Sequence, residues 1–386
     1  MKNRLVLAGA AVAASVGLCV VAAPAMAQPS DATITCGDVA GLIAAIGVAN
    51  TNAEGGTITL ADNCAYRFED DYSDSGNALP AITGHVTLTG KNTTLIRSVV
   101  DSLPLFRILA VNEGGSLTLK GITVTGGHVD GDGAGISNEG TLRLEQSKVA
   151  GNQAGGDGGG ISNAGGDVTL IESHVLTNVA TTTGGEPGDG GGINNSAEGT
   201  LRLKKSTVVG NTADEDGGGI QNLGRVTIEH THLANNDARD GNGGALNNLG
   251  RATITYSKFI ENWAGLEGGA VNNGVDAILD VQETSFIGNK SGRDGGAINN
   301  EGTATLRKSK VLENSAGRDG GGINNEQVAG ADAARLTLEY TTVADNRAAR
   351  NGGGINNWPG GVVTLQESKI VNNLPTNCYG TVPGCS

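Results

Sequence analysis

Short triplets of apolar, polar and apolar residues recur along most of this chain. Leu142-Arg143-Leu144 is one of them, Ser147-Lys148-Val149 has a small residue in first place, and Ile161-Ser162-Asn163 closes the same unit. Because side chains alternate between the two faces of a strand, the outer residues of a triplet point one way and the middle residue the other. Each unit therefore predicts three short β-strands separated by turns.

The unit repeats at a period of about 25 residues, and such a period indicates a stack of similar coils. Its most constant part is the phrase Gly-Gly-Gly-Ile-Ser-Asn at 158–163, and every close copy ends on an asparagine. These asparagines are Asn138, Asn163, Asn195, Asn222, Asn248, Asn273, Asn300, Asn325 and Asn357. Two of the intervals are longer, which indicates loops inserted into a regular repeat.

Equivalent strands stacked at a spacing of about 4.8 Å form parallel sheets, and parallel connections are right-handed. The pattern therefore predicts an all-β fold, a right-handed parallel β-helix with three short strands per coil of about 25 residues. A leucine-rich repeat has a similar period but places a helical segment in its second half. The equivalent stretch here, 154–160, is rich in glycine, which disfavours a helix.

The glycines of the phrase are not equivalent. The second and third residues before the isoleucine are glycine in nearly every copy, with Ala134 as the exception. The first residue before it accepts alanine, as in Ala245, Ala270 and Ala297. We infer that at least one of the stricter positions requires a positive φ or leaves no room for a Cβ.

Two series of asparagines predict ladders along the stack. One is the series at the end of the phrase, and the other is Asn152, Asn178, Asn211, Asn236, Asn262, Asn289, Asn314, Asn346 and Asn373. An amide has donors and an acceptor, so each asparagine can bond to its equivalent in the next coil. We interpret both series as structural and not catalytic.

The chain begins with features of a secretion signal. Lys2 and Arg4 precede an apolar run, and Ala25-Met26-Ala27 fits a cleavage site, so residues 1–27 are expected to be removed. No second apolar span follows, and we expect a secreted, extracellular protein without a membrane span. We divide the remainder into a cap helix with irregular first coils (28–113), regular coils (114–373) and a C-terminal tail (374–386). The helix is expected at 40–49, with Asp38 as its N-cap.

Four cysteines remain after removal of the signal: Cys36, Cys64, Cys378 and Cys385. They form one pair near each end of the chain, with none in the repeats between them. In an oxidising compartment this arrangement favours the disulfides Cys36–Cys64 and Cys378–Cys385. Metal binding is the alternative, but no CxxC motif supports it.

The chain is acidic. Its formal charge is −14, and removing Lys2 and Arg4 with the signal takes it to −16. An acidic surface repels phosphate backbones, which excludes nucleic acid as the expected partner. We expect a monomer, with a polysaccharide or a surface protein as the candidate partner.

An acid or amide lies four residues before the last apolar residue of each phrase: Asp132, Asp157, Asp189, Asp216, Asn242, Glu267, Asp294, Asp319 and Asn351. Asp-Gly is a turn signal, but stacked like charges also repel one another. Water, calcium or neighbouring arginines must offset that repulsion. Arg293 and Arg318 can serve at the acids that follow them, and we hypothesise weak Ca²⁺ binding along Asp157, Asp189 and Asp216, where no arginine is near.

Two motifs carry a family resemblance. Phe259-Ile-Glu-Asn262 and Phe286-Ile-Gly-Asn289 are each followed by a Gly-Gly-Ala phrase. This pairing resembles the FxxN and GGAI motifs of polymorphic outer-membrane-protein repeats, and the whole chain after the signal is similar to secreted bacterial right-handed β-helix proteins. The resemblance implies a bacterial extracellular β-helix.

For function, we expect a non-catalytic structural or adhesive protein of the cell surface or extracellular space. The alternatives are a carbohydrate-active β-helix enzyme, a lyase or hydrolase, and a Ca²⁺-dependent carbohydrate-binding module. An enzyme needs convergent charges that interrupt the repeat. Asp280, Gln282 and Glu283 beside Lys258 form the best candidate patch, and no catalytic residue is assigned.

Overall fold

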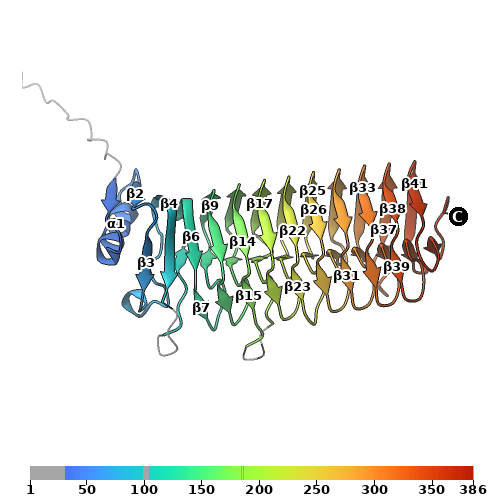
Figure 1. The fold of residues 1–386 in the computed structure, drawn as a ribbon, viewed down its shortest axis with the longest axis horizontal. Coiled ribbons are helices and arrows are strands. Elements are labelled where there is room, and N and C mark those ends of the chain that lie inside the picture. The colour runs from blue at the N-terminus through green and yellow to red at the C-terminus, as the bar shows by residue number, and fades with distance from the viewer. Residues whose placement is uncertain (1–30, 99–103, 184, 186, 386) are drawn as a thin grey trace, which may run out of the picture.

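The structure is a computed structural model that describes residues 31–385, except 99–103, 184 and 186. The expected signal peptide, 1–27, lies outside the described residues. Within them the chain winds into a parallel β-helix of about 13 turns, with its coils stacked along one long axis (Figure 1). The predicted fold class is confirmed.

Each regular coil contributes strands to four parallel columns. The first-strand column consists of β2 (Gly56–Leu60), the first part of β4 (His85–Arg97) and of β6 (Ser116–Thr125), β9 (Thr141–Glu145), β13 (Asp167–Ile171), β17 (Thr200–Lys204), β21 (Arg225–Glu229), β25 (Arg251–Thr255), β29 (Ile278–Gln282), β33 (Thr303–Arg307), β37 (Arg335–Glu339) and β41 (Val362–Gln366), with β1 (Ala32–Ile34) paired to β2. The second-strand column consists of β3 (Ala65–Phe68), the later parts of β4 and β6, β10 (Lys148–Ala150), β14 (His174–Leu176), β18 (Thr207–Val209), β22 (His232–Ala234), β26 (Lys258–Ile260), β30 (Ser285–Ile287), β34 (Lys310–Leu312), β38 (Thr342–Ala344) and β42 (Lys369–Val371).

The two remaining columns complete the coil. The third holds two-residue strands: β7 (His128–Val129), β11 (Gln153–Ala154), β15 (Val179–Ala180), β19 (Thr212–Ala213), β23 (Asp237–Ala238), β27 (Trp263–Ala264), β31 (Lys290–Ser291), β35 (Ser315–Ala316) and β39 (Arg347–Ala348). The fourth holds β5 (Leu109–Val111), β8 (Ile136–Asn138), β12 (Ile161–Asn163), β16 (Ile193–Asn195), β20 (Ile220–Asn222), β24 (Leu246–Asn248), β28 (Val271–Asn273), β32 (Ile298–Asn300), β36 (Ile323–Asn325), β40 (Ile355–Asn357) and β43 (Cys378–Tyr379).

The third column was not predicted. The sequence pattern indicated three strands per coil, and the structure adds a short one directly after each asparagine of the second ladder except Asn373. In β11, Gln153 points outward and Ala154 is fully buried. Two residues are too few to show a period of two, which is why alternation alone did not reveal this strand.

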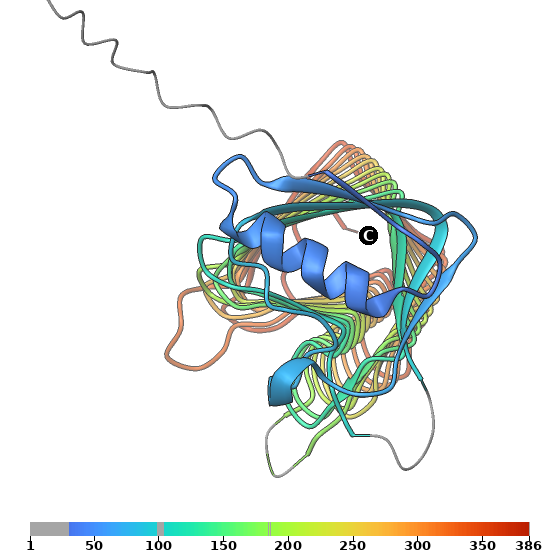
Figure 2. The same ribbon diagram turned by 90° about the vertical axis from the view of Figure 1, so that its left-hand side faces the viewer.

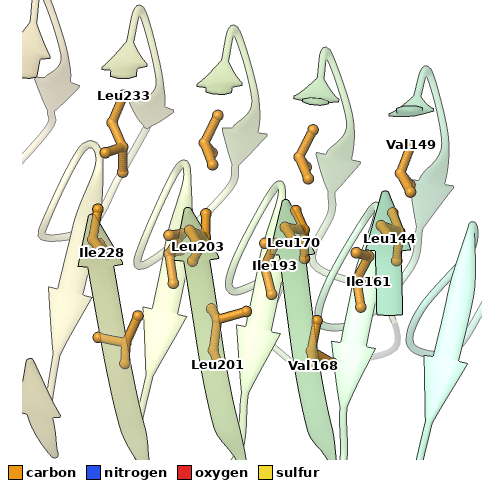
Figure 3. Close-up of a cluster of buried hydrophobic side chains, with 14 of the residues drawn as sticks. Leu144, Val149, Ile161, Val168, Leu170, Ile193, Leu201, Leu203, Ile228 and Leu233 are labelled. Atoms are coloured by element: carbon orange, nitrogen blue, oxygen red, sulfur yellow. The ribbon is translucent and has the colours of Figure 1, made fainter. Parts of the chain in front are cut away.

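The core is a set of aliphatic columns that run along the axis. Val168 pairs with Leu201, and Leu170 with Leu203, so like side chains stack on like from one coil to the next. These residues are at most 1% exposed, and Figure 3 shows them repeating coil after coil. Removing this apolar surface from water is the main driving force for folding, and each coil needs its neighbours to achieve it.

Helix α1 (Val39–Thr51) covers the N-terminal end of the stack, and a short 3₁₀ segment (Tyr72–Asp74) follows β3. Figure 2 shows α1 lying across the end of the coils. The Asp38 side chain accepts a hydrogen bond from Gly41 N at 2.8 Å, so the predicted N-cap is confirmed. Leu42 and Ile46 are fully buried against the first coils. The helix therefore shields an open apolar end from water.

The structure explains both strict glycine positions. Gly158, third before the isoleucine, has a φ of +67°, a conformation that costs other residues energy. A Cβ on Gly159 would lie 2.3 Å from Val179 O, so the second position of this copy has no room for a side chain, although Ala134 occupies it in the first copy. One position is thus strict because of its φ and the other because of its space.

Both disulfides have the pairing that the cysteine positions favoured. Cys36–Cys64 ties the segment before α1 to the first coils, and Cys378–Cys385 closes a loop in the C-terminal tail. Neither tie lies within the regular coils. In the described part of the chain, no helix is long and apolar enough to cross a membrane.

Candidate functional site

The asparagines at the end of the phrase form a continuous buried ladder. Asn163 Nδ2 donates to Asn195 Oδ1 at 2.7 Å and to Gly166 O at 2.8 Å. The same amide–amide bond, at 2.7–2.8 Å, joins Asn195, Asn222, Asn248, Asn273, Asn300, Asn325 and Asn357 in turn. These side chains are engaged in holding adjacent coils together.

The second ladder stabilises the corner between the second and third strands. Asn211 donates its backbone N–H and its side-chain Nδ2 to Asn236 Oδ1, at 3.2 and 3.0 Å. Its Nδ2 also reaches Val175 O in the preceding coil, at 3.0 Å. Three coils are thereby joined through one side chain, which gives the ladder a structural role.

A third ladder was not predicted. Asn272 Nδ2 donates to Asn247 Oδ1 at 2.8 Å, and the series continues through Asn299, Asn324 and Asn356 at 2.7–2.9 Å. These are the middle residues of the fourth strands, so alternation places them outside the core, yet they are at most 5% exposed. The signal was present as the repeated Asn-Asn doublet, but nothing in the sequence showed that a turn would bury it.

The acids proposed to bind calcium form a hydrogen-bonded column, which we call the acid column. It lies beside the middle residues of the fourth-column strands. Asp189 N donates to Asp157 Oδ1 at 3.0 Å, and Asp216 N donates to Asp189 Oδ1 at 2.9 Å. The second oxygens accept from side-chain amides: Asn194 bonds to Asp157 at 3.0 Å, Gln221 to Asp189 at 3.2 Å, and Asn247 to Asp216 at 3.0 Å. These donors help to offset the charge repulsion that the sequence pattern implies.

Within the described residues, no group of three or more His, Cys, Asp or Glu side chains is arranged to hold a metal ion. The structure places Asp157, Asp189 and Asp216 in successive coils and brings each one to an amide donor. Calcium binding along them stays a prediction.

The column also contains a carboxyl with a strongly shifted pKa. Burial raises the pKa of Asp189 to about 7; the hydrogen bond from Asp216 N opposes this rise, and the charge of Asp157 adds to it. Burial likewise raises the pKa of Asp216, against hydrogen bonds from Asn242. Protonation near neutral pH is therefore a second way to relieve the repulsion.

Arginines offset the negative charge in the C-terminal half of the column. Each one pairs with the acid of the preceding coil, and not with the acid that follows it in the sequence. Arg318 pairs with Asp294, which is fully buried, and Arg293 lies 3.8 Å from Glu267. Burial, followed by the charges of Asp294, Glu301 and Glu326, raises the pKa of Glu267 to about 7. The last two of those acids follow Asn-Asn doublets, and sequence reasoning did not connect them with the column.

The candidate enzymatic patch does not converge. Asp280 forms an ion pair with Arg251 at 3.0 Å, and Gln282 Nε2 donates to Glu283 at 3.3 Å. In the described chain no ion pair joins these residues to Lys258, which stands on the second-strand column. The patch is thus an exposed set of local pairs.

The outer face of the second strands carries two straight rows that the sequence analysis did not single out. We call it the second-strand face. Its cation row, the first residue of each strand, reads Lys148, His174, Thr207, His232, Lys258, Ser285, Lys310, Thr342 and Lys369. Its aliphatic row, the third residue, reads Ala150, Leu176, Val209, Ala234, Ile260, Ile287, Leu312, Ala344 and Val371.

Neither row contains an acid. The four lysines of the cation row form no ion pair within the described residues. The bulky members of the aliphatic row are half-buried, and Val371 is 42% exposed. Ala234 and Ala344 are buried, so the exposed aliphatic surface comes in segments. Apolar side chains gathered on one outward face are a feature of contact surfaces.

A protein-family model, the Chlamydia polymorphic membrane protein repeat, matches residues 283–301. That segment contains Phe286 to Asn289 and the following Gly-Gly-Ala-Ile phrase, so the resemblance inferred from these motifs is supported. No curated protein matches the chain significantly. The repeat points to a bacterial surface protein, and the two disulfides indicate an extracellular one.

Three solved structures align over most of the chain at low similarity. The A-module of the mannuronan C-5 epimerase AlgE6 from Azotobacter vinelandii is 13% identical, with 90% of this chain and 93% of that chain covered and a TM-score of 0.34. The Dettilon tailspike protein is 12% identical (86% and 68% covered, TM-score 0.32). An iota-carrageenase complexed to iota-carrageenan fragments is 9% identical (93% and 92% covered, TM-score 0.29). At these scores the alignments carry no argument about activity.

Proposed function

We propose that this chain is an extracellular, non-catalytic adhesive protein. Its β-helix is a rigid scaffold, and the second-strand face is its contact surface. The observation that carries the proposal is the aliphatic row, which places an aliphatic residue in every coil from Ala150 to Val371 and leaves its bulky members partly exposed, while Ala234 and Ala344 are 3% and 6% exposed. The row has one residue in each coil and runs parallel to the axis of the β-helix. It therefore fits an extended polymer that lies along this axis. On one side of the row the lysines favour a polymer of negative charge, whereas the exposed acids Glu261, Glu313 and Asp345 directly follow members of the row in the chain.

Retention on immobilised polymers tests the proposal. The purified chain is passed over polygalacturonate, alginate and chitin, with and without Ca²⁺, and both protein retention and chain cleavage are followed. We expect retention on an acidic polymer without cleavage. The double variant Ile260→Gln/Leu312→Gln should weaken retention, because it places polar amides in the middle of the aliphatic row.

Outward residues of the first strands provide the matched control. Thr253 and Thr305 lie in the same two coils, and the double variant Thr253→Gln/Thr305→Gln should retain normally. Equal retention of the two double variants would show that the second-strand face is not the contact surface. Retention that requires Ca²⁺ would favour a calcium-dependent carbohydrate-binding module.

A carbohydrate-active enzyme is the second candidate, and Glu267 is the observation that favours it. A half-buried carboxyl with a pKa of about 7 is in the range of a general acid at neutral pH. Cleavage of any polymer in the same assay, abolished by Glu267→Gln, would replace the adhesive proposal with an enzymatic one.

A further inference from the structure

A concave basic site lies near the N-terminal end of the second-strand face. We call it the basic depression. It has a volume of about 520 Å³ and lies where the paired strands β4, β6, β10 and β14 adjoin; Figure 1 labels β4, β6 and β14 in this region. Its lining includes Lys91, Lys120, Lys148 and His174. Volumes of this size are typical of small-molecule sites.

The depression forms at the corner between the first and second strands, where β4 and β6 differ from the later coils. In later coils the residue between the first and second strands has a positive φ and carries a side chain, as at Gln146, Glu172 and Lys205. In β6 the same corner is Gly121, with a φ of +67°. In β4 the register shifts between Thr89 and Thr93, so the strand bulges there. The hollow is therefore specific to these first coils.

Its charge is opposite to that of the whole chain. Three lysines and His174 line the depression, and no acid does, although the formal charge of the protein is −14. Burial and the charge of Lys148 lower the pKa of His174, so the lysines supply the positive charge. Within the described residues, neither Lys91 nor Lys148 forms an ion pair. Lys120 lies 3.4 Å from Glu145, but that carboxylate also pairs with Arg143 at 2.6 Å. The depression thus holds positive charge that the protein itself does not neutralise.

The neutral part of the lining is hydrogen-bonding in character. Thr89 and Thr123 carry hydroxyls, which pair with hydroxyl groups of a ligand. The amides of Asn92 and Gln146 donate to Asn63 Oδ1 at 3.1 Å and to Glu172 at 3.3 Å, and their oxygens are acceptors. Lysines supply point charges for a carboxylate or a sulfate. A ligand that combines one anionic group with several hydroxyls matches this set of groups.

We propose that the basic depression binds an acidic sugar, with Lys91 and Lys148 holding its carboxylate or sulfate group. The proposal deepens the adhesive function and rests on it for the extracellular setting in which acidic polysaccharides occur. It places one specific subsite at the start of the second-strand face, where an anionic polymer chain is anchored.

Calorimetric titration of the full chain with soluble saccharides tests this site. The probes are trigalacturonate, a sulfated heparin disaccharide, neutral maltotriose and inorganic phosphate. We expect at least one of the two acidic saccharides to bind, with an affinity that falls as salt is added. The double variant Lys91→Gln/Lys148→Gln should lower that affinity about tenfold or more, because two charged contacts are lost.

The matched control is Lys310→Gln/Lys369→Gln, on the same cation row but outside the depression, and it should bind as the unmodified chain does. Failure of both acidic saccharides to bind, or an equal loss in the control, would overturn the site. Maltotriose or phosphate binding as tightly as the acidic sugars would overturn the assigned chemistry. The adhesive proposal is tested separately. It fails if the unmodified chain is not retained on any polymer, or if Ile260→Gln/Leu312→Gln is retained as strongly as the unmodified chain.

Discussion

An asparagine inside a ladder has its polar atoms engaged on three coils. Asn236 accepts from the backbone and side chain of Asn211, at 3.2 and 3.0 Å, and donates to Val208 O and Asn262 Oδ1, both at 2.9 Å. Such a group is costly to remove because its partners are buried and have no access to water. Single side-chain amides therefore contribute substantially to the stability of the repeat.

We predict that Asn236→Ala lowers the free energy of unfolding by roughly 2–4 kcal/mol, since it strands buried donors and acceptors. The measurement is the midpoint of denaturant-induced unfolding. Gln153→Ala, an exposed residue of β11, is the control and should stay within about 0.5 kcal/mol of the unmodified chain. Equal midpoints for the two variants would contradict a structural role of the ladder.

Asp189 predicts a pH dependence with a definite sign. Its pKa is about 7 in the folded chain and about 4 when unfolded, so between these values the folded state binds the extra proton. Its contribution to stability therefore falls as pH rises from about 4 to about 7 and is constant above that. Asp189→Asn removes this titration, and asparagine fits the column, because Asn242 Oδ1 already accepts from Glu267 N at 3.2 Å.

We expect Asp189→Asn to gain stability relative to the unmodified chain as pH is raised from 5 to 8, measured by thermal unfolding at each pH. Asp167→Asn is the control: this exposed acid pairs with Arg202 at 3.2 Å on the surface, where an ion pair contributes little, so its effect on stability should be small. A constant difference for Asp189→Asn would show that its carboxyl is ionised throughout.

The cap helix is the element most clearly defined by a single role. On the face of α1 that packs against the coils, Leu42, Ile46 and Ala49 are fully buried. Val48, on the opposite face of the helix, is 56% exposed. Leu42→Ala should destabilise the N-terminal end by about 2–5 kcal/mol, because it leaves a cavity against the first coils. Val48→Ala removes a similar side chain from water and should have little effect.

Hydrogen exchange of residues 31–60 is the measurement suited to this prediction, since coils of a solenoid can open from an end. Faster exchange in the Leu42 variant, confined to α1 and β2, supports the capping role. Faster exchange spread equally along the regular coils would mean that the helix does not act as a local cap.

The calcium hypothesis concerns the acid column as a whole. If the ion binds along Asp157, Asp189 and Asp216, chelation should lower the melting temperature and Ca²⁺ should restore it. Asp189→Asn should abolish that response, since it removes the central carboxylate. An unmodified chain whose calorimetric melting temperature is the same with chelator and with Ca²⁺ would refute the hypothesis.

The limits of sequence reasoning follow from how each element is encoded. The strands of three columns, the glycine positions and two ladders repeat or alternate, and the cap helix has one apolar face, so the order of residues shows them directly. The two-residue strands of the third column are too short to show alternation. The third ladder and the acid column depend on a turn that covers an outward row, as at Asn272 and Asp216. Alternation states only which side a residue is on, not what covers that side. The basic depression was equally hidden, because it depends on an irregular corner at Gly121.

The whole molecule behaves as a stack whose coils are interchangeable in register. Val226 lies between Leu201 and Ala252, and Asn236 lies between Asn211 and Asn262, so each interior position meets the same type of residue on either side. Stability in such an array is a sum of coils and of the interfaces between neighbours. Removing one whole coil should therefore leave a folded, shorter rod.

Deletion of residues 225–250 joins Gly224 to Arg251, which takes the place of Arg225 above β17. It restores every ladder, so we expect a cooperative unfolding transition, β-type circular dichroism, and a rod shortened by about 4.8 Å in small-angle scattering. Deletion of residues 225–237 is the control, because it removes half a coil and sets strands against turns. That chain should fail to fold. If the whole-coil deletion fails in the same way, the coils are not interchangeable, and stability depends on contacts particular to each one.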